Sequence, residues 1–269
     1  MKIVNKQEYL IRKQAALAIP PVVGRILCVK CLRPPAGCFC DSIIPFDSQS
    51  EVRILMHPKE ARKEKVGTGR MANLCCKRSK IIVGVNFSQN VEVQKILSDE
   101  QYLPILLYPG EGAHNLSVAP LPLLPLSQKR PLFFVIDGTW PCAKTMMRES
   151  AILHSLPRVS FDVSQVSRFS IKQQPVSNCL STIESIFELF NCLDKWKHER
   201  LEGRHHILLS TLDKLVQFQI ACALDPSKKS YRTARTNGYK DPSKRSYPKK
   251  WQERKICFEK KNYPTLGNT

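Results

Sequence analysis

The sequence has no long apolar run, and no stretch approaches the roughly 18–20 apolar residues needed to cross a bilayer. The apolar patch at 15–23 is short, contains two prolines and has no clear small-residue cleavage site, so it makes a poor signal peptide. An internal repeat is also missing, which argues against a repeat architecture. These absences predict a soluble, cytoplasmic protein without a membrane partner, with the nucleus as a second compartment in a eukaryotic cell.

Acidic residues are scarce relative to basic ones. The chain of 269 residues has 23 Asp and Glu against 42 Lys and Arg, which gives a net charge of +19. This exceeds the magnitude of roughly 2–8 that is typical of small soluble domains. Such an excess favours a polyanionic partner over charge that serves solubility alone. The apolar fraction of 42% argues against wholesale disorder.

The 11 cysteines are unevenly spread, and four of them lie within 13 residues. Cys28, Cys31, Cys38 and Cys40 form the pattern C-x2-C-x6-C-x-C, which suits four thiolates around one structural Zn²⁺. Such a site would be closed and non-catalytic, because protein ligands fill every position. An iron–sulfur cluster and unligated thiols are the alternatives. The other cysteines have no metal-ligand spacing and are expected to be small core residues.

Short apolar runs alternate with helical patterns, which predicts an α/β fold with a mostly parallel sheet. The runs are continuous, as in strands that are covered on both faces. Expected strands are 52–56, 81–85, 105–108, 132–137 and 158–161, and expected helices are 69–77, 91–97, 142–154, 182–196 and 206–223. We expect four regions: a helix within 1–24, a cysteine-rich zinc loop at 25–44, an α/β domain at 45–224 and a tail at 225–269.

The tail differs from the rest of the chain in composition. Residues 228–261 hold 13 Lys or Arg and 3 Asp or Glu, with few apolar residues, which is typical of a basic, largely disordered segment. Tyr231, Tyr239, Tyr247 and Trp251 lie among these charges. Aromatic rings can stack on RNA bases while the cations meet phosphates, so the tail favours RNA contact over a purely solubilising role.

The expected strand 132–137 ends in an acidic residue, Asp137, followed by Gly138, Thr139 and Trp140. Ligand sites in parallel sheets lie beyond the carboxyl ends of the strands, so these side chains are candidate site residues. The alternative is a plain turn, because Asp-Gly is an ordinary turn pair and the Trp ring can fill a core.

Polar residues also follow other expected strands or open the helices after them. His57 and Glu60 follow the strand 52–56, and Thr68 lies where a helix could open with its amides facing an anion. Tyr108-Pro109-Gly110 follows the strand 105–108. The run 180–184 is explained structurally, with Ser181 or Thr182 capping a helix and Glu184 in its first turn. Together these residues indicate a site assembled at one sheet edge.

The combination resembles the DTW-domain family of tRNA-uridine aminocarboxypropyltransferases. The likeness rests on the four clustered cysteines with Arg33-Pro34, on the Asp-x-Thr-Trp motif at 137–140 and on other short segments across about 25–185. Those segments are His57-Pro58-x-Glu60, Thr68-Gly69, Tyr108-Pro109-Gly110, Gln174-Pro175 and Leu180-Ser181-Thr182-Ile183-Glu184. The family prefers Arg where this chain has Lys172, which weakens an anion contact there.

The resemblance implies a SPOUT-like, knotted fold that binds S-adenosylmethionine. The implied reaction moves the 3-amino-3-carboxypropyl group to N3 of a uridine in tRNA and releases methylthioadenosine. Asp137 is the first candidate for general base and Glu184 the second. The implied donor-binding residues are His57, Glu60, Thr68, Asp137, Thr139, Trp140, Leu180 and Thr182. The donor's carboxylate needs a cation, for which Arg168 and Lys172 are candidates. The protein is expected to be a monomer or a homodimer.

Three other functions fit parts of the sequence. An S-adenosylmethionine-dependent RNA methyltransferase would use the same fold and donor. A non-catalytic, zinc-containing RNA-binding protein would explain the tail and the cysteine loop, but it would leave the polar residues after several strands without a role. The basic charge also does not distinguish rRNA from tRNA as the substrate.

Overall fold

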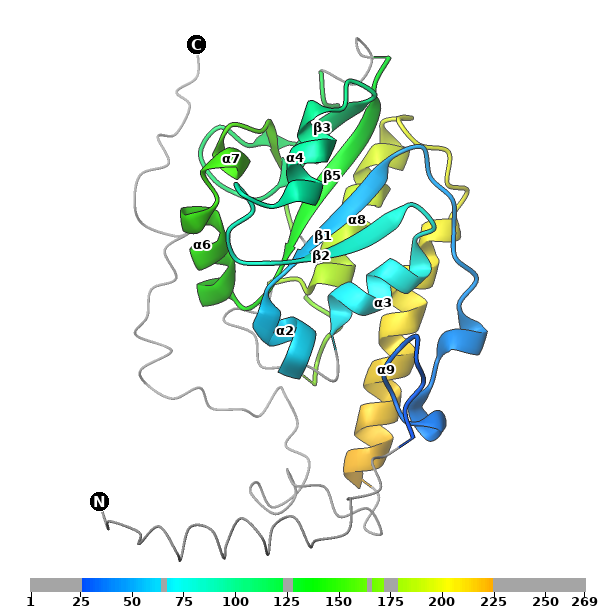
Figure 1. The fold of residues 1–269 in the computed structure, drawn as a ribbon. Coiled ribbons are helices and arrows are strands. Elements are labelled where there is room, and N and C mark those ends of the chain that lie inside the picture. Colours follow the sequence, from blue (N-terminus) through cyan, green and yellow to red (C-terminus); the bar gives the residue numbers. More distant parts are fainter. Residues whose placement is uncertain (1–25, 64–66, 123–127, 164–165, 172–178, 225–269) are drawn as a thin grey trace, which may run out of the picture.

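The structure is a computed structural model that describes residues 26–63, 67–122, 128–163, 166–171 and 179–224 (Figure 1). Several predictions fall on residues outside these ranges. They are the N-terminal helix within 1–24, the basic tail 225–269 with its four aromatic residues, Lys172 and Gln174-Pro175. The division of the chain into regions therefore stays a prediction at both ends.

Six strands form one sheet in the order β2-β1-β5-β3-β6-β4, and every neighbouring pair is parallel. The strands are β1 (Glu51–Met56), β2 (Ser79–Val83), β3 (Tyr102–Leu107), β4 (His114–Asn115), β5 (Arg130–Asp137) and β6 (Arg158–Ser160). The predicted parallel α/β fold is confirmed. The short edge strand β4 was not predicted, and a two-residue strand leaves no periodic signal.

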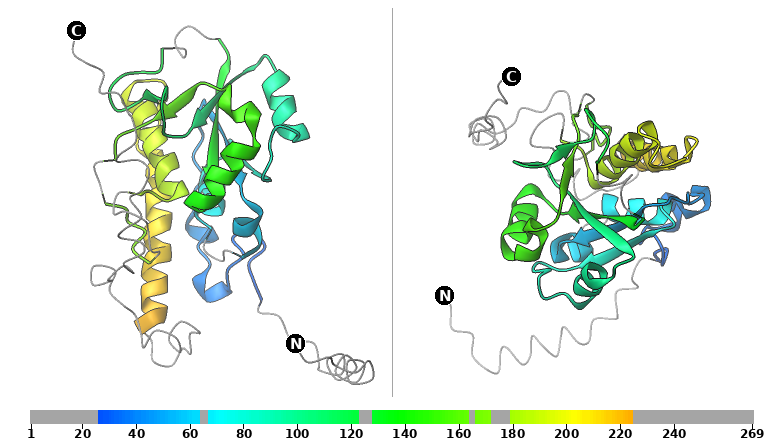
Figure 2. Two further views of the ribbon diagram at one scale, coloured as in Figure 1. Left: turned by 90° about the vertical axis from the view of Figure 1, so that its left-hand side faces the viewer. Right: turned by 90° about the horizontal axis from the view of Figure 1, so that it is seen from above.

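Helices cover both faces of the sheet (Figures 1 and 2). One face packs against α3 (Thr68–Cys75), α8 (Thr182–Lys195) and α9 (Ile207–Leu224). The other packs against α4 (Val91–Ser98), α6 (Trp140–Glu149) and α7 (Ala151–His154). A short helix that the sequence did not predict, α2 (Pro58–Lys63), follows β1. The molecule thus has three layers, as continuous apolar strands require.

The alternation of side chains along each strand divides the core into two clusters. Ile54, Phe133 and Val135 face the layer of α3, α8 and α9. Leu55 and Phe134 face the layer of α4, α6 and α7. All five side chains are buried, as expected for strands that are covered on both faces.

The predicted single helix at 142–154 is wrong, because the chain breaks it at Ser150. The Ser150 hydroxyl accepts a hydrogen bond from the backbone N–H of Phe87 at 2.9 Å and donates to the carbonyl of Val85 at 3.2 Å. Ser150 is fully buried, with φ −114° and ψ 75°. Because Ser150 binds the loop after β2, the helix is interrupted there and the chain forms two helices, α6 and α7. The same loop explains why β2 ends at Val83 and not at the predicted residue 85.

None of the helices in the described part of the chain is both long enough and apolar enough to span a membrane. The trefoil knot implied by the family resemblance stays a prediction.

Candidate functional site

The strands β1 and β5 are neighbours. After β1 and the short α2, the chain enters α3 on one face of the sheet, and after β5 it enters α6 on the other face. Open parallel sheets bind their ligands beyond the carboxyl ends of strands at such a position. Met56 and Asp137 are paired in register at these ends, so the residues that follow them meet at one place.

Asp137 lies at the centre of this edge and is 5% exposed. Its Oδ1 accepts a hydrogen bond of 2.5 Å from the hydroxyl of Thr182, the first residue of α8. Its carboxylate also lies against Gly69, where an added Cβ would come within 2.5 Å of Oδ2. Gly69 belongs to the first turn of α3. The carboxylate thus lies at the N-terminal ends of two helices, where helix dipoles stabilise negative charge.

His57 is bound to Asp137 through a backbone hydrogen bond. Its N–H donates to the carbonyl of Asp137 at 2.9 Å. The ring Nδ1 accepts from the backbone N–H of Lys59 at 3.1 Å, so the neutral ring carries its proton on Nε2. Burial, followed by the charge of Lys59, lowers the pKa of His57. The ring is therefore neutral at physiological pH.

The other predicted site residues lie around this centre. Thr68 opens α3 and is buried, and Glu60 is buried in the first turn of α2. Thr139 is the exposed N-cap residue of α6, and Trp140 is the half-buried first residue of that helix. Leu180 is half-buried, two residues before α8. The Tyr108 segment follows β3, the other neighbour of β5, at the same edge of the sheet.

Glu184 holds the start of α8 together. Its carboxylate accepts five hydrogen bonds of 2.5–3.0 Å, from the Ser167 hydroxyl to both oxygens, from the backbone N–H groups of Arg168 and Ser181 and from the Ser181 hydroxyl. The bond from the Ser181 N–H belongs to a capping box, as the sequence at 181–184 indicates. Glu184 is 3% exposed. These contacts give it a structural task, while its role as second candidate base stays a prediction.

Arg168, a candidate for the donor's carboxylate, extends toward solvent. Its Nη1 donates to Oδ2 of Asp213 on α9 at 3.0 Å, and both side chains are well exposed. An exposed ion pair of this kind is weak and exchangeable. The other candidate, Lys172, is outside the described residues.

The four clustered cysteines place their sulfur atoms within 4.8 Å of one another. The distances from Cys28 to Cys40 and from Cys31 to Cys38 are both 3.7 Å between Sγ atoms. Four thiolates on one tetrahedral zinc with bonds of about 2.3 Å lie about 3.8 Å apart. The backbone N–H groups of Cys31 and Lys30 lower the pKa of the Cys28 thiol to about 6, whereas burial raises the pKa of the Cys31 and Cys40 thiols, so a metal would have to displace their protons. The cluster could therefore hold zinc.

The cysteine loop packs against α9 through Arg33. This side chain is 4% exposed, donates from Nε to the carbonyl of Gly37 at 2.7 Å and lies over the rings of Phe39 and Phe218. Gly37 is required here, because an added Cβ would lie 2.7 Å from the Phe218 ring. A buried cation beside a metal with four thiolates would offset the negative charge of that centre.

Two features of the site were not predicted. The sequence indicates that the start of α3 faces an anion, but the anion in contact with Gly69 is the protein's own Asp137. The segment Ser167–Arg168 that holds Glu184 also left no signal, because its role depends on contacts between distant parts of the chain. The Thr-Gly pair at 68–69 was the only hint of the close approach.

Comparison with known proteins shows the family of this chain. A curated protein of Drosophila melanogaster named tRNA-uridine aminocarboxypropyltransferase 2 is 31% identical over 185 residues, which covers 66% of this chain and 70% of the relative. Proteins of the same name from Macaca fascicularis and Mus musculus are 27% and 28% identical, covering 76% and 72% of this chain and 67% and 63% of theirs. No solved structure matches. A family model described as DTW domain matches residues 25–220, and the chain belongs to the DTW-domain family.

Proposed function

We propose that this protein transfers the 3-amino-3-carboxypropyl group of S-adenosylmethionine to N3 of a uridine in tRNA, releasing methylthioadenosine. The observation that supports this most is the position of Asp137. It ends β5 of a DTW domain beside the end of β1, in contact with the first turns of α3 and α8. The names of the curated relatives specify the group and the acceptor.

Asp137 is the residue that we assign to the acceptor uridine. A neutral imide is a poor nucleophile, so its N3 proton must be removed as the new bond forms. As N3 bonds to carbon, the carbon–sulfur bond breaks and its electron pair stays on sulfur, while the proton passes to the Asp137 carboxylate. The hydrogen bond from Thr182 fixes the carboxylate without protonating it. Asp137 thereby acts as the general base or orients the uracil.

The residues around Asp137 suit a bound S-adenosylmethionine. The donor supplies an electrophilic methylene next to its sulfonium, so the reaction requires no metal. The donor's own carboxylate needs a cation, for which Arg168 remains the candidate among the described residues. Thr68, Thr139 and Thr182 offer hydroxyls, and Trp140 offers a ring for adenine or uracil. We assign His57, Glu60 and Leu180 to the rest of the donor-binding site.

We propose structural zinc for Cys28, Cys31, Cys38 and Cys40, because the sulfur spacing agrees with a single tetrahedral ion. An iron–sulfur cluster distributes its thiolates over several iron atoms, so its sulfur atoms would be spread more widely than those of this cluster. The zinc has a structural role in this proposal, since all four ligand positions belong to the protein.

To test this proposal, purified protein and unmodified tRNA are incubated with S-adenosylmethionine that is labelled either in the aminocarboxypropyl carbons or in the methyl group. Label that enters tRNA only from the first form, with release of methylthioadenosine, is the expected result. Label only from the methyl group would make the protein a methyltransferase. Binding of tRNA without transfer from either donor would favour the non-catalytic RNA-binding protein.

Asp137→Asn is the matched variant for the base. The amide keeps the size of the side chain and an oxygen for the Thr182 hydrogen bond but cannot take a proton. We expect single-turnover transfer to slow by about 10²–10⁴-fold, with tRNA affinity little changed. Turnover close to that of the wild type would exclude Asp137 as the base.

A further inference from the structure

A second charged surface lies at the opposite edge of the sheet, at the amino ends of the strands. It is concave and carries four cations: Arg78, Lys129, Arg130 and Lys197, which together we call the basic groove. Three glutamines lie between them, at positions 49, 101 and 128, and no Asp or Glu of the described chain lines the surface. Arg130 opens β5 and Asp137 ends it, so the groove and the candidate active site lie at the two ends of one strand.

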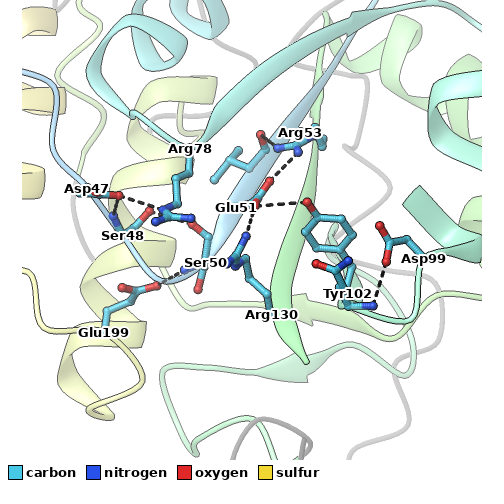
Figure 3. Close-up of polar contacts among 12 residues, drawn as sticks. Asp47, Ser48, Ser50, Glu51, Arg53, Arg78, Asp99, Tyr102, Arg130 and Glu199 are labelled. Carbon is cyan, nitrogen blue, oxygen red and sulfur yellow. Dashed lines mark hydrogen bonds and ion pairs between the residues drawn. The ribbon is translucent and has the colours of Figure 1, made fainter. Parts of the chain in front are cut away.

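Two acidic side chains beneath the groove, Glu51 and Glu199, are buried and bound to the protein itself (Figure 3). Glu51 is 8% exposed and accepts from Arg53 at 2.5 Å and from Arg130 at 2.9 Å. Burial opposes ionisation of Glu51, but the hydrogen bonds from both arginines outweigh it and lower its pKa. Glu199 is 2% exposed and accepts from the N–H groups of Gln49 and Ser50. These carboxylates position the groove from below.

The two arginines of the groove are paired and still suited to a further anion. Arg78 donates to Asp47 at 2.9 Å, but both side chains are at least 40% exposed, so this pair is weak and can exchange. Arg130 reaches Glu51 through Nη1 alone. A guanidinium has five N–H donors in a planar fork that matches phosphate oxygens.

Lys197 is held at the groove in a conformation that favours glycine. Its φ is +60°, directly after the end of α8. The N–H of His198 bonds to the carbonyl of Leu193 at 2.9 Å, as in a Schellman motif, whose left-handed position is usually glycine. A lysine in this position is strained relative to glycine. Such strain points to a role other than stability for this side chain.

We propose that the basic groove binds the phosphate backbone of the tRNA, away from the nucleotide that is modified. The cations meet phosphate oxygens, and the glutamines reach phosphates or ribose hydroxyls. That the RNA is tRNA rests on the proposed function. A single tRNA is large enough to contact both edges of this domain, so the groove contributes affinity and orientation while the chemistry takes place at Asp137.

Lys197→Gly separates binding from folding. It removes a cation from the groove and also relieves the left-handed strain, so we expect a higher melting temperature together with weaker tRNA binding. Glu202→Gly is the matched control, because Glu202 has φ +51° and lies outside the groove lining. It should raise the melting temperature without weakening binding.

Salt dependence tests the interaction with phosphate itself. For Lys197→Gly and for Lys129→Gln, the slope of log affinity against log salt should fall by roughly one for each phosphate that the variant no longer neutralises. Lys95→Gln and Lys214→Gln remove equal charge from exposed positions on α4 and α9 and should change the slope less. In steady state the groove variants should raise KM for tRNA and leave kcat unchanged.

Equal slopes for the groove variants and their controls would overturn the proposal. So would groove variants that bind tRNA normally but lose affinity for vesicles of anionic phospholipid, since the surface would then serve a membrane. Binding is measured without S-adenosylmethionine, so the proposal can hold when aminocarboxypropyl transfer is absent, and it can fail when transfer is confirmed.

Discussion

Gly69 shows how one missing methyl group can determine the position of the Asp137 carboxylate. Its Cα packs so closely on Asp137 that any side chain would occupy the space of the carboxylate oxygens. The hydrogen bond from Thr182 approaches the same carboxylate from a different helix. The position of Asp137 therefore depends on three segments that lie far apart in the sequence.

We predict that Gly69→Ala slows transfer strongly while the protein stays folded. The new Cβ would lie 2.5 Å from Oδ2 of Asp137, so the carboxylate must move. A misplacement on the scale of one ångström costs about a hundredfold in rate. The measurement is single-turnover transfer together with the melting temperature.

Gly67→Ala is the control for this variant. A Cβ at Gly67 meets only the Arg70 side chain, at 3.8 Å, and the backbone φ there is −72°. This variant should keep its activity. If the two alanine variants transfer at the same rate, the close approach of Gly69 is not what positions Asp137.

At the scale of elements, the N-terminus of α8 is held in place by one carboxylate. Glu184 ties the helix to the segment at 167–168, and Thr182, two residues earlier in the same first turn, holds Asp137. Disturbing Glu184 therefore affects the fold first and the site through it.

We predict that Glu184→Gln lowers the free energy of unfolding by about 1–3 kcal/mol. In the amide an NH2 group replaces one of the two carboxylate oxygens, so it would face either the Arg168 N–H or the Ser181 N–H, each of which is itself a donor. Urea unfolding measures the loss. An unchanged stability with abolished transfer would instead support Glu184 as a base.

The cysteine loop is a second element whose position depends on others. Arg33 of the loop lies over the Phe218 ring of α9, and the loop cysteines pack against the core beneath the helical layer and not in a separate unit. Metal binding in this loop should therefore stabilise the whole domain.

We predict one zinc per chain by metal analysis, and a lower melting temperature after chelation, because a ligand that binds only the folded state stabilises it. Cys31→Ser should lose the metal and show the same lower melting temperature. Cys179→Ser, outside the cluster, should retain both. Protein that contains iron, or that is unaffected by chelation, would contradict the assignment.

For the whole molecule, histidine burial predicts that stability falls in acid. Burial lowers the pKa of His57, His198 and His205 in the folded state. The unfolded chain binds protons below about pH 6.5, where the folded protein still resists them. The contribution of these histidines to the free energy of unfolding is therefore complete above about pH 6.5 and decreases as the pH falls below it.

His205→Phe tests this dependence. The ring of His205 is 3% exposed, stacks on Phe187 at 5.2 Å and has no hydrogen-bond partner for either nitrogen among the described residues. Phenylalanine should raise stability by about 1 kcal/mol at neutral pH. It should also reduce the loss of stability between about pH 7.5 and pH 5.5, measured by urea unfolding. An unchanged pH dependence would exclude His205 as a contributor.

The sequence allowed the local parts of this molecule to be predicted. Continuous apolar runs located four strands, and a shorter segment at 158–161 was expected as a fifth. The parallel sheet then brought the residues after β1 and β5 to one edge, as expected. The order of the strands, the break at Ser150 and the approach of Gly69 to Asp137 could not be predicted, because each depends on contacts between segments far apart in the chain. The basic groove was hidden for the same reason, since its cations come from separate segments of the chain.

The length of β5 also fixes the distance between the basic groove and the candidate active site. Arg130 and Asp137 are joined by seven steps of an extended, buried strand, which fixes their separation at about 23 Å. A rigid strand cannot adjust to its substrate, so it serves as a ruler. If the groove holds tRNA phosphates, the modified uridine must lie at this distance from those phosphates in the folded RNA. The enzyme would then select its uridine by position as well as by local sequence.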